Sequence, residues 1–198
     1  GTNGVVIINP DKAVLSEYKN RHERWERERL KLRRLRKTPT TTLDGAAIEL
    51  HANIELPDDV AGAMENGADG VGLFRTEFLY LNRRDLPTED EQFEAYRKVV
   101  QDMDGLPVTI RTFDLGADKQ IDNTERVAPN PALGLRAIRL CLAEPPMFHH
   151  QLRAILRTSH YGKVRILIPM LSSANEVNQT LHLIDEAKES LHEDGIPY

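Results

Sequence analysis

Two arginines in this chain each follow a short apolar run and each precede a threonine. Arg75 ends the run at residues 70–74, and Arg111 ends the run at residues 108–110. Between them, residues 88–103 have the apolar spacing of a helix. Two parallel strands joined by a helix end at the same edge of a sheet. We therefore expect Arg75 and Arg111 to lie close together as an anion site, because guanidinium groups suit phosphate and carboxylate.

Length, charge and cysteine content limit the class of protein. The chain has 198 residues and a formal net charge of -5, which suits one domain, or one domain and part of another. The slight acidity does not indicate a nucleic-acid partner, and no apolar run is long enough to span a bilayer. A single cysteine, Cys141, excludes an intramolecular disulfide and a cysteine metal cluster, and a reducing cytoplasm is the natural compartment.

The beginning of the chain predicts a strand, a long helix and a boundary. Residues 4–10 are an apolar run that ends at a proline, which predicts a buried strand. Residues 11–37 predict a helix whose second half is basic. A solvated connecting helix and a nucleic-acid arm are both possible interpretations, and the interleaved glutamates favour the first. Residues 38–42 contain a proline and a threonine run, which oppose a helix and mark a domain boundary.

After this boundary, strand-like runs alternate with helical patterns. Strands are expected at residues 46–54, 70–74, 108–113 and 163–170, and helices at 57–66, 88–103, 133–141, 146–158 and after 173. Capping-box spacing marks two helix starts, Thr88 with Glu91 and Ser173 with Glu176. Four such units form either a small open sheet or half of an eight-stranded barrel of about 250 residues, and periodicity leaves both open. No G-x-G-x-x-G or Walker sequence indicates a dinucleotide or P-loop site.

Several stretches are similar to the phosphoenolpyruvate-utilising enzymes. Residues 66–80, which include Gly-Val-Gly-Leu-Phe-Arg-Thr-Glu, resemble the signature of that family. Further stretches resemble the enzyme I group of the bacterial sugar phosphotransferase system, at residues 86–96, 110–119, 130–139, 151–157 and 166–170. A nitrogen-regulatory paralogue, pyruvate phosphate dikinase and phosphoenolpyruvate synthase are alternatives within the resemblance. A non-enzymatic interaction module that uses the basic helix is a more distant alternative.

The resemblance implies one part of a phosphoryl relay. In this family a histidine on a swivelling domain takes the phosphoryl group of phosphoenolpyruvate, with Mg²⁺ bound at the barrel. The histidine then passes it to a histidine-containing phosphocarrier protein. By this resemblance, residues 1–10 are the end of the phosphohistidine domain and residues 11–43 are a linker helix. Residues 44–198 are then an α/β unit, the first half of a TIM (β/α)8 barrel.

The resemblance also assigns roles to individual residues. Arg75 and Arg111 match two substrate-binding arginines, Arg136 matches a further one, and Lys119 matches a lysine near the phosphate. The family's phosphorylated histidine, Mg²⁺ ligands and catalytic cysteine match no residue of this chain, so we expect the chain alone to be inactive. Cys141 has a different sequence context from the catalytic cysteine and is expected to be a core residue.

The partners follow from the same resemblance and from the shape of a half barrel. Phosphoenolpyruvate is the expected ligand, and the phosphocarrier protein is expected to contact the phosphohistidine part of the protein. A half barrel leaves two strand edges unpaired, so we expect a homodimer or another form of self-association. We expect no nucleic-acid or membrane partner and a cytoplasmic location.

Overall fold

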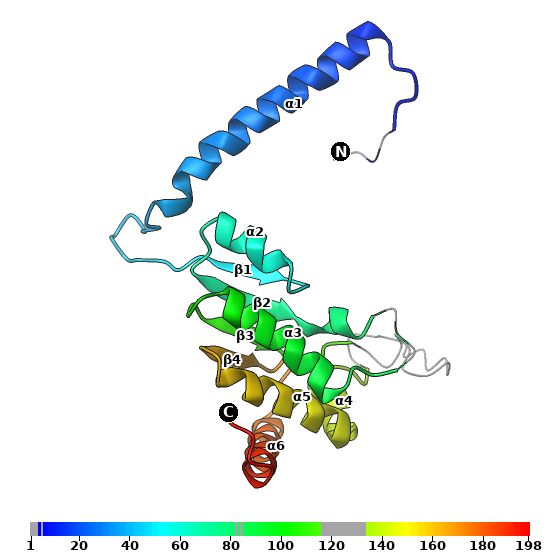
Figure 1. Cartoon of the computed structure of the whole chain (residues 1–198), viewed down its shortest axis with the longest axis vertical. Coiled ribbons are helices and arrows are strands. Elements are labelled where there is room, and N and C mark those ends of the chain that lie inside the picture. Colours follow the sequence, from blue (N-terminus) through cyan, green and yellow to red (C-terminus); the bar gives the residue numbers. More distant parts are fainter. Residues whose placement is uncertain (1–3, 5, 82, 84, 116–133) are drawn as a thin grey trace. The chain divides into compact units, whose positions relative to one another are not determined.

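The chain divides after Ala47 in the computed structural model, into one unit of residues 1–47 and another of residues 48–198. The structure describes residues 4, 6–81, 83, 85–115 and 134–198. Figure 1 shows one long helix in the first unit and alternating strands and helices in the second.

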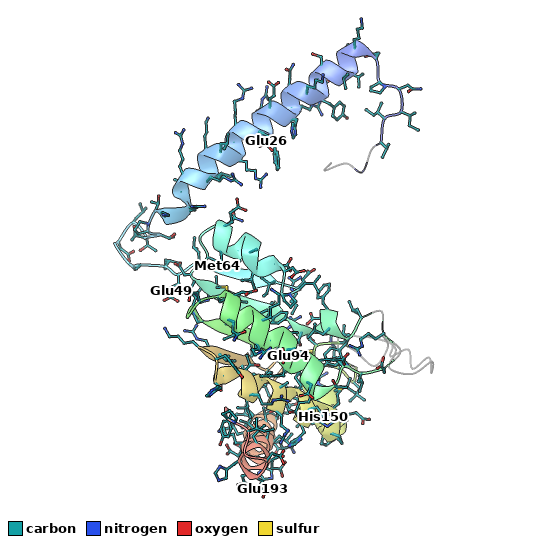
Figure 2. All side chains as sticks on the ribbon, viewed as in Figure 1. Glu26, Glu49, Met64, Glu94, His150 and Glu193 are labelled. Carbon is teal, nitrogen blue, oxygen red and sulfur yellow. The ribbon has the colours of Figure 1, made fainter. Side chains whose placement is uncertain are left out.

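Helix α1, Lys12–Arg33, is the main element of the first unit. Asp11 caps it, because its carboxylate accepts a hydrogen bond from the N–H of Val14 at 2.8 Å. A 3-10 turn, η1, Arg34–Lys37, follows directly. No residue of α1 is buried, and Figure 2 shows its side chains, Glu26 among them, spread around the helix. This agrees with the interpretation of a solvated helix stabilised by charge pairs one turn apart.

The strand predicted at residues 4–10 is absent from the described part of that segment. Residue 4 and residues 6–10 are all exposed, and none of them lies in a strand. A strand is stable only where another strand binds its backbone N–H and C=O groups. Among the described residues of this unit, the only strand-like pairing is an isolated bridge between Thr41 and Ala47. The prediction was wrong because an apolar run does not by itself supply a partner.

The second unit is built on a four-stranded parallel sheet. Its strands are β1, His51–Ile54; β2, Gly70–Arg75; β3, Val108–Arg111; and β4, Val164–Leu167. Their spatial order is β1-β2-β3-β4, so each described strand pairs with the next one along the chain. A doubly wound sheet reverses its order at a switch point, and these strands do not. The sequential parallel order confirms the predicted fold class, a part of a parallel barrel.

A helix follows each strand, and the main connecting helices lie on one face of the sheet. The helices of this unit are α2, Asp59–Glu65; α3, Glu89–Asp102; α4, Ile138–Ala143; α5, Pro145–Ser159; and α6, Ala174–Glu193, with a 3-10 turn η2, Thr76–Leu79. Right-handed crossovers that advance in one direction place their helices on the same face, as Figure 1 shows for α2, α3 and α5. The capping boxes predicted at Thr88 and Ser173 are both present.

The helix-facing side of the sheet forms the main hydrophobic core. Val71 and Phe74 of β2 and Ile110 of β3 are completely buried there. Val71 and Phe74 share this face although three positions separate them, because the register of β2 shifts between them. Side chains alternate along a strand, so Arg75 and Arg111, which follow Phe74 and Ile110, point to the opposite face.

A second core cluster lies where α4, α5 and α6 meet. Cys141 is completely buried there, together with Phe113, Leu152 and Leu191. The core role predicted for Cys141 is therefore confirmed. Burial raises the pKa of the thiol to about 12, so it stays protonated and unreactive near neutral pH.

Three strands are shorter than predicted, and one of them is β3, which was expected to reach residue 113 and ends at Arg111. The strand expected from residue 46 begins only at His51, because Asp69 binds both backbone groups of Leu50. The Asp69 carboxylate accepts from the Leu50 N–H at 2.7 Å, and the Asp69 N–H donates to the Leu50 carbonyl at 2.8 Å. The strand expected to reach residue 170 ends at Leu167, the register partner of Arg111 at the end of β3.

One helix also differs from its prediction. The helix expected from residue 133, which lies outside the described residues, begins at Ile138. Ala137 directly before it has a φ of 49°, a left-handed conformation that a helix does not accommodate. The helix expected at residues 146–158 is present as α5, with proline in its first turn.

Candidate functional site

Arg75 and Arg111 are register partners at the carboxyl ends of β2 and β3. Neighbouring strands in a sheet lie about 4.8 Å apart, so the backbones of the two residues are adjacent. The structure thus brings together the two arginines that the sequence placed at strand ends. Arg75 is partly exposed, and the side chain of Arg111 is 18% exposed.

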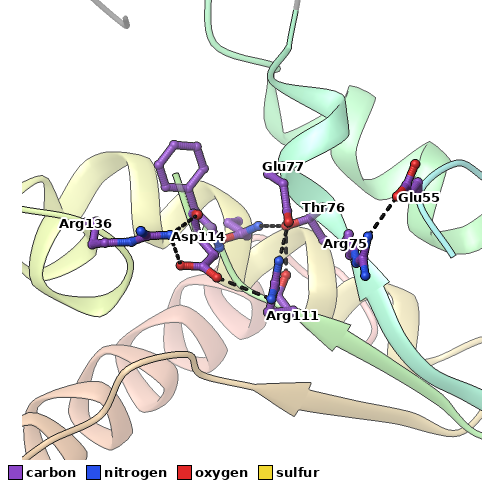
Figure 3. A network of polar contacts seen from close by, with 9 residues as sticks. Glu55, Arg75, Thr76, Glu77, Arg111, Asp114 and Arg136 are labelled. Atoms are coloured by element: carbon purple, nitrogen blue, oxygen red, sulfur yellow. Dashed lines mark hydrogen bonds and ion pairs between the residues drawn. The ribbon is translucent and has the colours of Figure 1, made fainter. Parts of the chain in front are cut away.

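Carboxylates hold the guanidinium groups of both arginines (Figure 3). Arg75 Nη1 donates to Glu55 Oε1 at 2.8 Å. Arg111 Nη2 donates to Glu77, and its Nη1 lies 3.2 Å from Asp114 Oδ2. Charge-assisted hydrogen bonds of this kind fix the direction in which a guanidinium group points.

Arg136 joins the same cluster from the segment before α4. Its Nη2 lies 3.2 Å from Asp114 Oδ1 and 3.3 Å from the Asp114 carbonyl oxygen. The Asp114 carboxylate therefore bridges Arg111 and Arg136, one oxygen to each, as Figure 3 shows. The structure brings three of the four predicted ligand-binding residues into one cluster. The fourth, Lys119, lies outside the described residues.

The backbone after β2 positions the carboxylate of Glu77. Thr76 and Glu77 begin the 3-10 turn η2 directly after Arg75, and both are buried. The Thr76 hydroxyl donates to the backbone carbonyl of Arg111 at 2.7 Å. This bond ties η2 to the end of β3 and places Glu77 beside the Arg111 guanidinium.

The cluster is close to electrically neutral but not fully hydrogen-bonded. Three arginines face three carboxylates, those of Glu55, Glu77 and Asp114. Among the described side chains, Glu77 Oε2, Arg111 Nε and Arg136 Nε are buried without a hydrogen-bond partner. Buried polar atoms are usually paired, so these three atoms are available for further hydrogen bonds within the cluster.

The surroundings of Arg75 are accessible from the edge of the sheet. An open groove of about 590 Å³ runs between β1 and α2, and Asn53, Glu55 and Arg75 are among its lining residues. Part of the Arg75 side chain is therefore open to solvent in this groove, where Glu55 binds its guanidinium.

The carboxylates of this cluster do not form a Mg²⁺ site. In the described ranges, no three His, Cys, Asp or Glu side chains are grouped so that they could hold a metal ion. Glu55, Glu77 and Asp114 are each bound to an arginine, whereas Mg²⁺ needs oxygen ligands in octahedral geometry. No chemical step through a metal follows from these residues.

Sequence reasoning missed the three carboxylates, although a signal for them exists. Glu55 directly follows β1, Glu77 lies two residues after the end of β2, and Asp114 lies three residues after the end of β3. An acidic residue therefore follows each of three successive strands. Where strands are parallel, residues just beyond their carboxyl ends share one edge of the sheet, so this repeat predicts acidic partners for the arginines.

Comparison with known proteins identifies the family. The family described as PEP-utilising enzyme, PEP-binding domain, matches residues 29–198. The phosphoenolpyruvate-protein phosphotransferase of Cupriavidus necator is 55% identical over 202 residues, which cover 100% of this chain and 34% of that protein. Proteins of the same name from Staphylococcus epidermidis and Geobacillus stearothermophilus are 48% and 47% identical, over 98% and 99% of this chain and 34% of each relative.

The chain spans about a third of the length of these curated relatives, 34% in each case. In the part of the chain that the structure describes, no helix has both the length and the apolar character needed to cross a membrane. The match over residues 29–198, which is most of the chain, shows that this chain belongs to the PEP-utilising enzymes, by way of their PEP-binding domain.

Proposed function

We propose that this chain provides the phosphoenolpyruvate-binding arginines of a phosphoenolpyruvate-protein phosphotransferase. The observation that supports the proposal is the register pairing of Arg75 and Arg111 at the carboxyl ends of β2 and β3. Ligand sites of parallel α/β folds lie at this end of the strands. Arg136 belongs to the same site, because Asp114 links it to Arg111.

The chemistry of phosphoenolpyruvate suits such a cluster. The molecule has a phosphate and a carboxylate close together, and adjacent guanidinium groups offer each of them paired N–H donors. Fixed positive charges offset the charge on the phosphoryl group during transfer and orient it. The carboxylates of Glu55, Glu77 and Asp114 hold the arginines until the ligand takes over part of their hydrogen bonds.

The remaining parts of the relay are proposed for the complete protein. In that protein, the phosphoryl group of phosphoenolpyruvate passes to a histidine and then to a histidine-containing phosphocarrier protein, in sugar uptake. Residues 1–10 are then the end of the phosphohistidine domain, residues 11–43 the linker helix and residues 44–198 the first half of the barrel. Mg²⁺ would supply further positive charge to bound phosphoenolpyruvate, and residues outside the arginine cluster would hold this metal ion. The location proposed is the cytoplasm.

Calorimetric titration with phosphoenolpyruvate tests the site. We expect weak binding to this chain that Mg²⁺ does not strengthen, and a loss of at least about tenfold in Arg75→Ala and in Arg111→Ala, since each removes charge-assisted hydrogen bonds. Arg165→Ala is the matched control, because Arg165 is an exposed arginine of β4, two residues before the strand ends. Equal losses in all three variants would show a general charge effect and overturn the proposal.

The open edges of the sheet support a proposal about assembly. Within the described sheet, β1 and β4 are the edge strands. Edge strands pair readily with other chains, so we propose that this chain by itself forms a homodimer or associates with itself. Light scattering decides this, and a mass of 22.5 kDa at all concentrations, that of a single chain, would refute it.

A further inference from the structure

Gln151 of α5 is a buried residue that binds one residue after the end of β2 and one after the end of β3. Its side chain is almost completely enclosed, at 1% exposure. Its Oε1 accepts from the N–H of Phe113 at 2.9 Å, and its Nε2 donates to Thr76 Oγ1 at 3.1 Å. The Thr76 hydroxyl in turn donates to the carbonyl of Arg111 at 2.7 Å. One amide thus connects the residue after Arg75 with the backbone around Arg111.

Only one orientation of the Gln151 side-chain amide satisfies all of its hydrogen bonds. A backbone N–H can only donate, so Phe113 requires the amide oxygen on its side. The amide nitrogen then has two hydrogens, one for Thr76 and one for the Tyr96 hydroxyl at 3.2 Å. The Tyr96 hydroxyl donates onward to Gln92 Oε1 at 3.1 Å. A buried network in which each of these groups has its partner holds one geometry.

The strand ladder aligns the backbones of Arg75 and Arg111 but does not by itself fix where their side chains point. The register between β2 and β3 shifts between Val71 and Phe74, and the pairs given after this shift are Phe74 with Ile110 and Arg75 with Arg111. The side chains of the two arginines do not hold each other either, because Arg75 binds Glu55 and Arg111 binds carboxylates on its other side. The relative position of the two guanidinium groups therefore depends on the strand ladder and also on the hydrogen bonds that join the residues after the two strands.

We propose that Gln151 is a positioning residue that sets the spacing between Arg75 and Arg111, and so the preference for a ligand with two anionic groups. This inference rests on the proposed function of the site. Gln151 has no contact with the ligand itself. It acts through Thr76 on the β2 side and through Phe113 on the β3 side.

Binding of two different anions distinguishes a role of Gln151 in positioning the arginines from a role in stability alone. Phosphoenolpyruvate reaches both arginines with its two anionic groups, whereas inorganic phosphate needs only one of them. Gln151→Leu removes the hydrogen bonds and keeps a side chain of similar size. We expect its affinity for phosphoenolpyruvate to fall about tenfold, as for the loss of one charge-assisted hydrogen bond, and its affinity for inorganic phosphate to change less than about twofold.

Two further variants make the calorimetric test specific. Val100→Ala removes volume from the core near Gly162, before β4 begins, so it lowers stability without touching the strand ends. We expect Val100→Ala to bind both anions as the unmodified chain does. Thr76→Val removes only the hydroxyl between Gln151 and Arg111, and serves if Gln151→Leu does not fold. The same selective loss is expected from it.

Each outcome decides a separate claim. A selective loss of phosphoenolpyruvate affinity in Gln151→Leu or Thr76→Val supports the positioning role. Unchanged affinity, or equal losses for both anions, overturns the positioning role and leaves the proposed function standing. If the unmodified chain binds neither anion, the proposed function of this cluster fails, and the positioning role fails with it.

Discussion

Replacing Asp114 with asparagine tests whether the arginine cluster needs this charge. The Asp114 side chain is 15% exposed and lies 3.2 Å from both Arg111 and Arg136. At that distance two unit charges attract by about 5 kcal/mol at an effective dielectric constant of ~20, before the cost of desolvation is subtracted. Asparagine has the same shape but only one acceptor oxygen, so one of the arginines would face an NH₂ group.

We expect Asp114→Asn to lower the free energy of unfolding by about 2 kcal/mol, the usual size for a hydrogen bond to a charged group. The matched control is Asp185→Asn. Asp185 and Lys188 lie closer together, at 2.9 Å, but their side chains are 67% and 41% exposed. Solvent screens such a pair, so we expect a change of at most about 0.5 kcal/mol.

Urea unfolding followed by far-ultraviolet circular dichroism measures both changes. With a urea dependence of about 2 kcal/mol per M, the expected loss in Asp114→Asn moves the midpoint by about 1 M. Equal shifts for Asp114→Asn and Asp185→Asn would refute the reasoning that burial decides the strength of these pairs. Greater stability of Asp114→Asn would also refute it, because desolvation would then outweigh the attraction.

Three further expectations concern the scaffold. Thr88→Ala removes a capping box and should lower stability by about 1 kcal/mol in urea unfolding. Gly72→Ala places a Cβ 2.9 Å from the Cβ of His51, and should cost about 1–3 kcal/mol that His51→Gly partly restores. Above pH 9 the unfolded chain loses a Cys141 proton that the folded chain keeps up to about pH 12, so stability should fall with rising pH, and less steeply in Cys141→Ala.

The alternation of strands and helices was predictable because its signals are local. The hydroxyl of Thr88 and the carboxylate of Glu91 lie three residues apart and define a helix start without help from the rest of the chain. Strand pairing is not local. Residues 4–10 and 46–50 are both apolar enough for a strand, yet neither segment forms one in its described part. Ala47 makes only an isolated bridge and Leu50 is bound by Asp69, so residues 46–50 do not enter a continuous ladder.

The positions of the two arginines in the site were predictable, but the residues that hold them were not. Arg75 and Arg111 could be placed because each ends an apolar run, and parallel strands end at one edge. Their pairing with Glu77 and Asp114 depends on the turns after the strands, which no periodic pattern describes. Gln151 lies 38 residues from Phe113 and 75 from Thr76. Such long-range hydrogen bonds could not be inferred from spacing along the chain.

The carboxylates explain how three arginines can stay together in the absence of an anion, and they also restrict which anion can bind. Without Glu55, Glu77 and Asp114, the guanidinium groups would repel one another in a partly buried place. With them, a ligand must replace hydrogen bonds that already exist. An anion with one charged group exchanges one ion pair for another and gains little. A ligand with two anionic groups at the spacing of Arg75 and Arg111 gains a second set of hydrogen bonds at no further cost in translational freedom, so the proposed site favours phosphoenolpyruvate over simple anions.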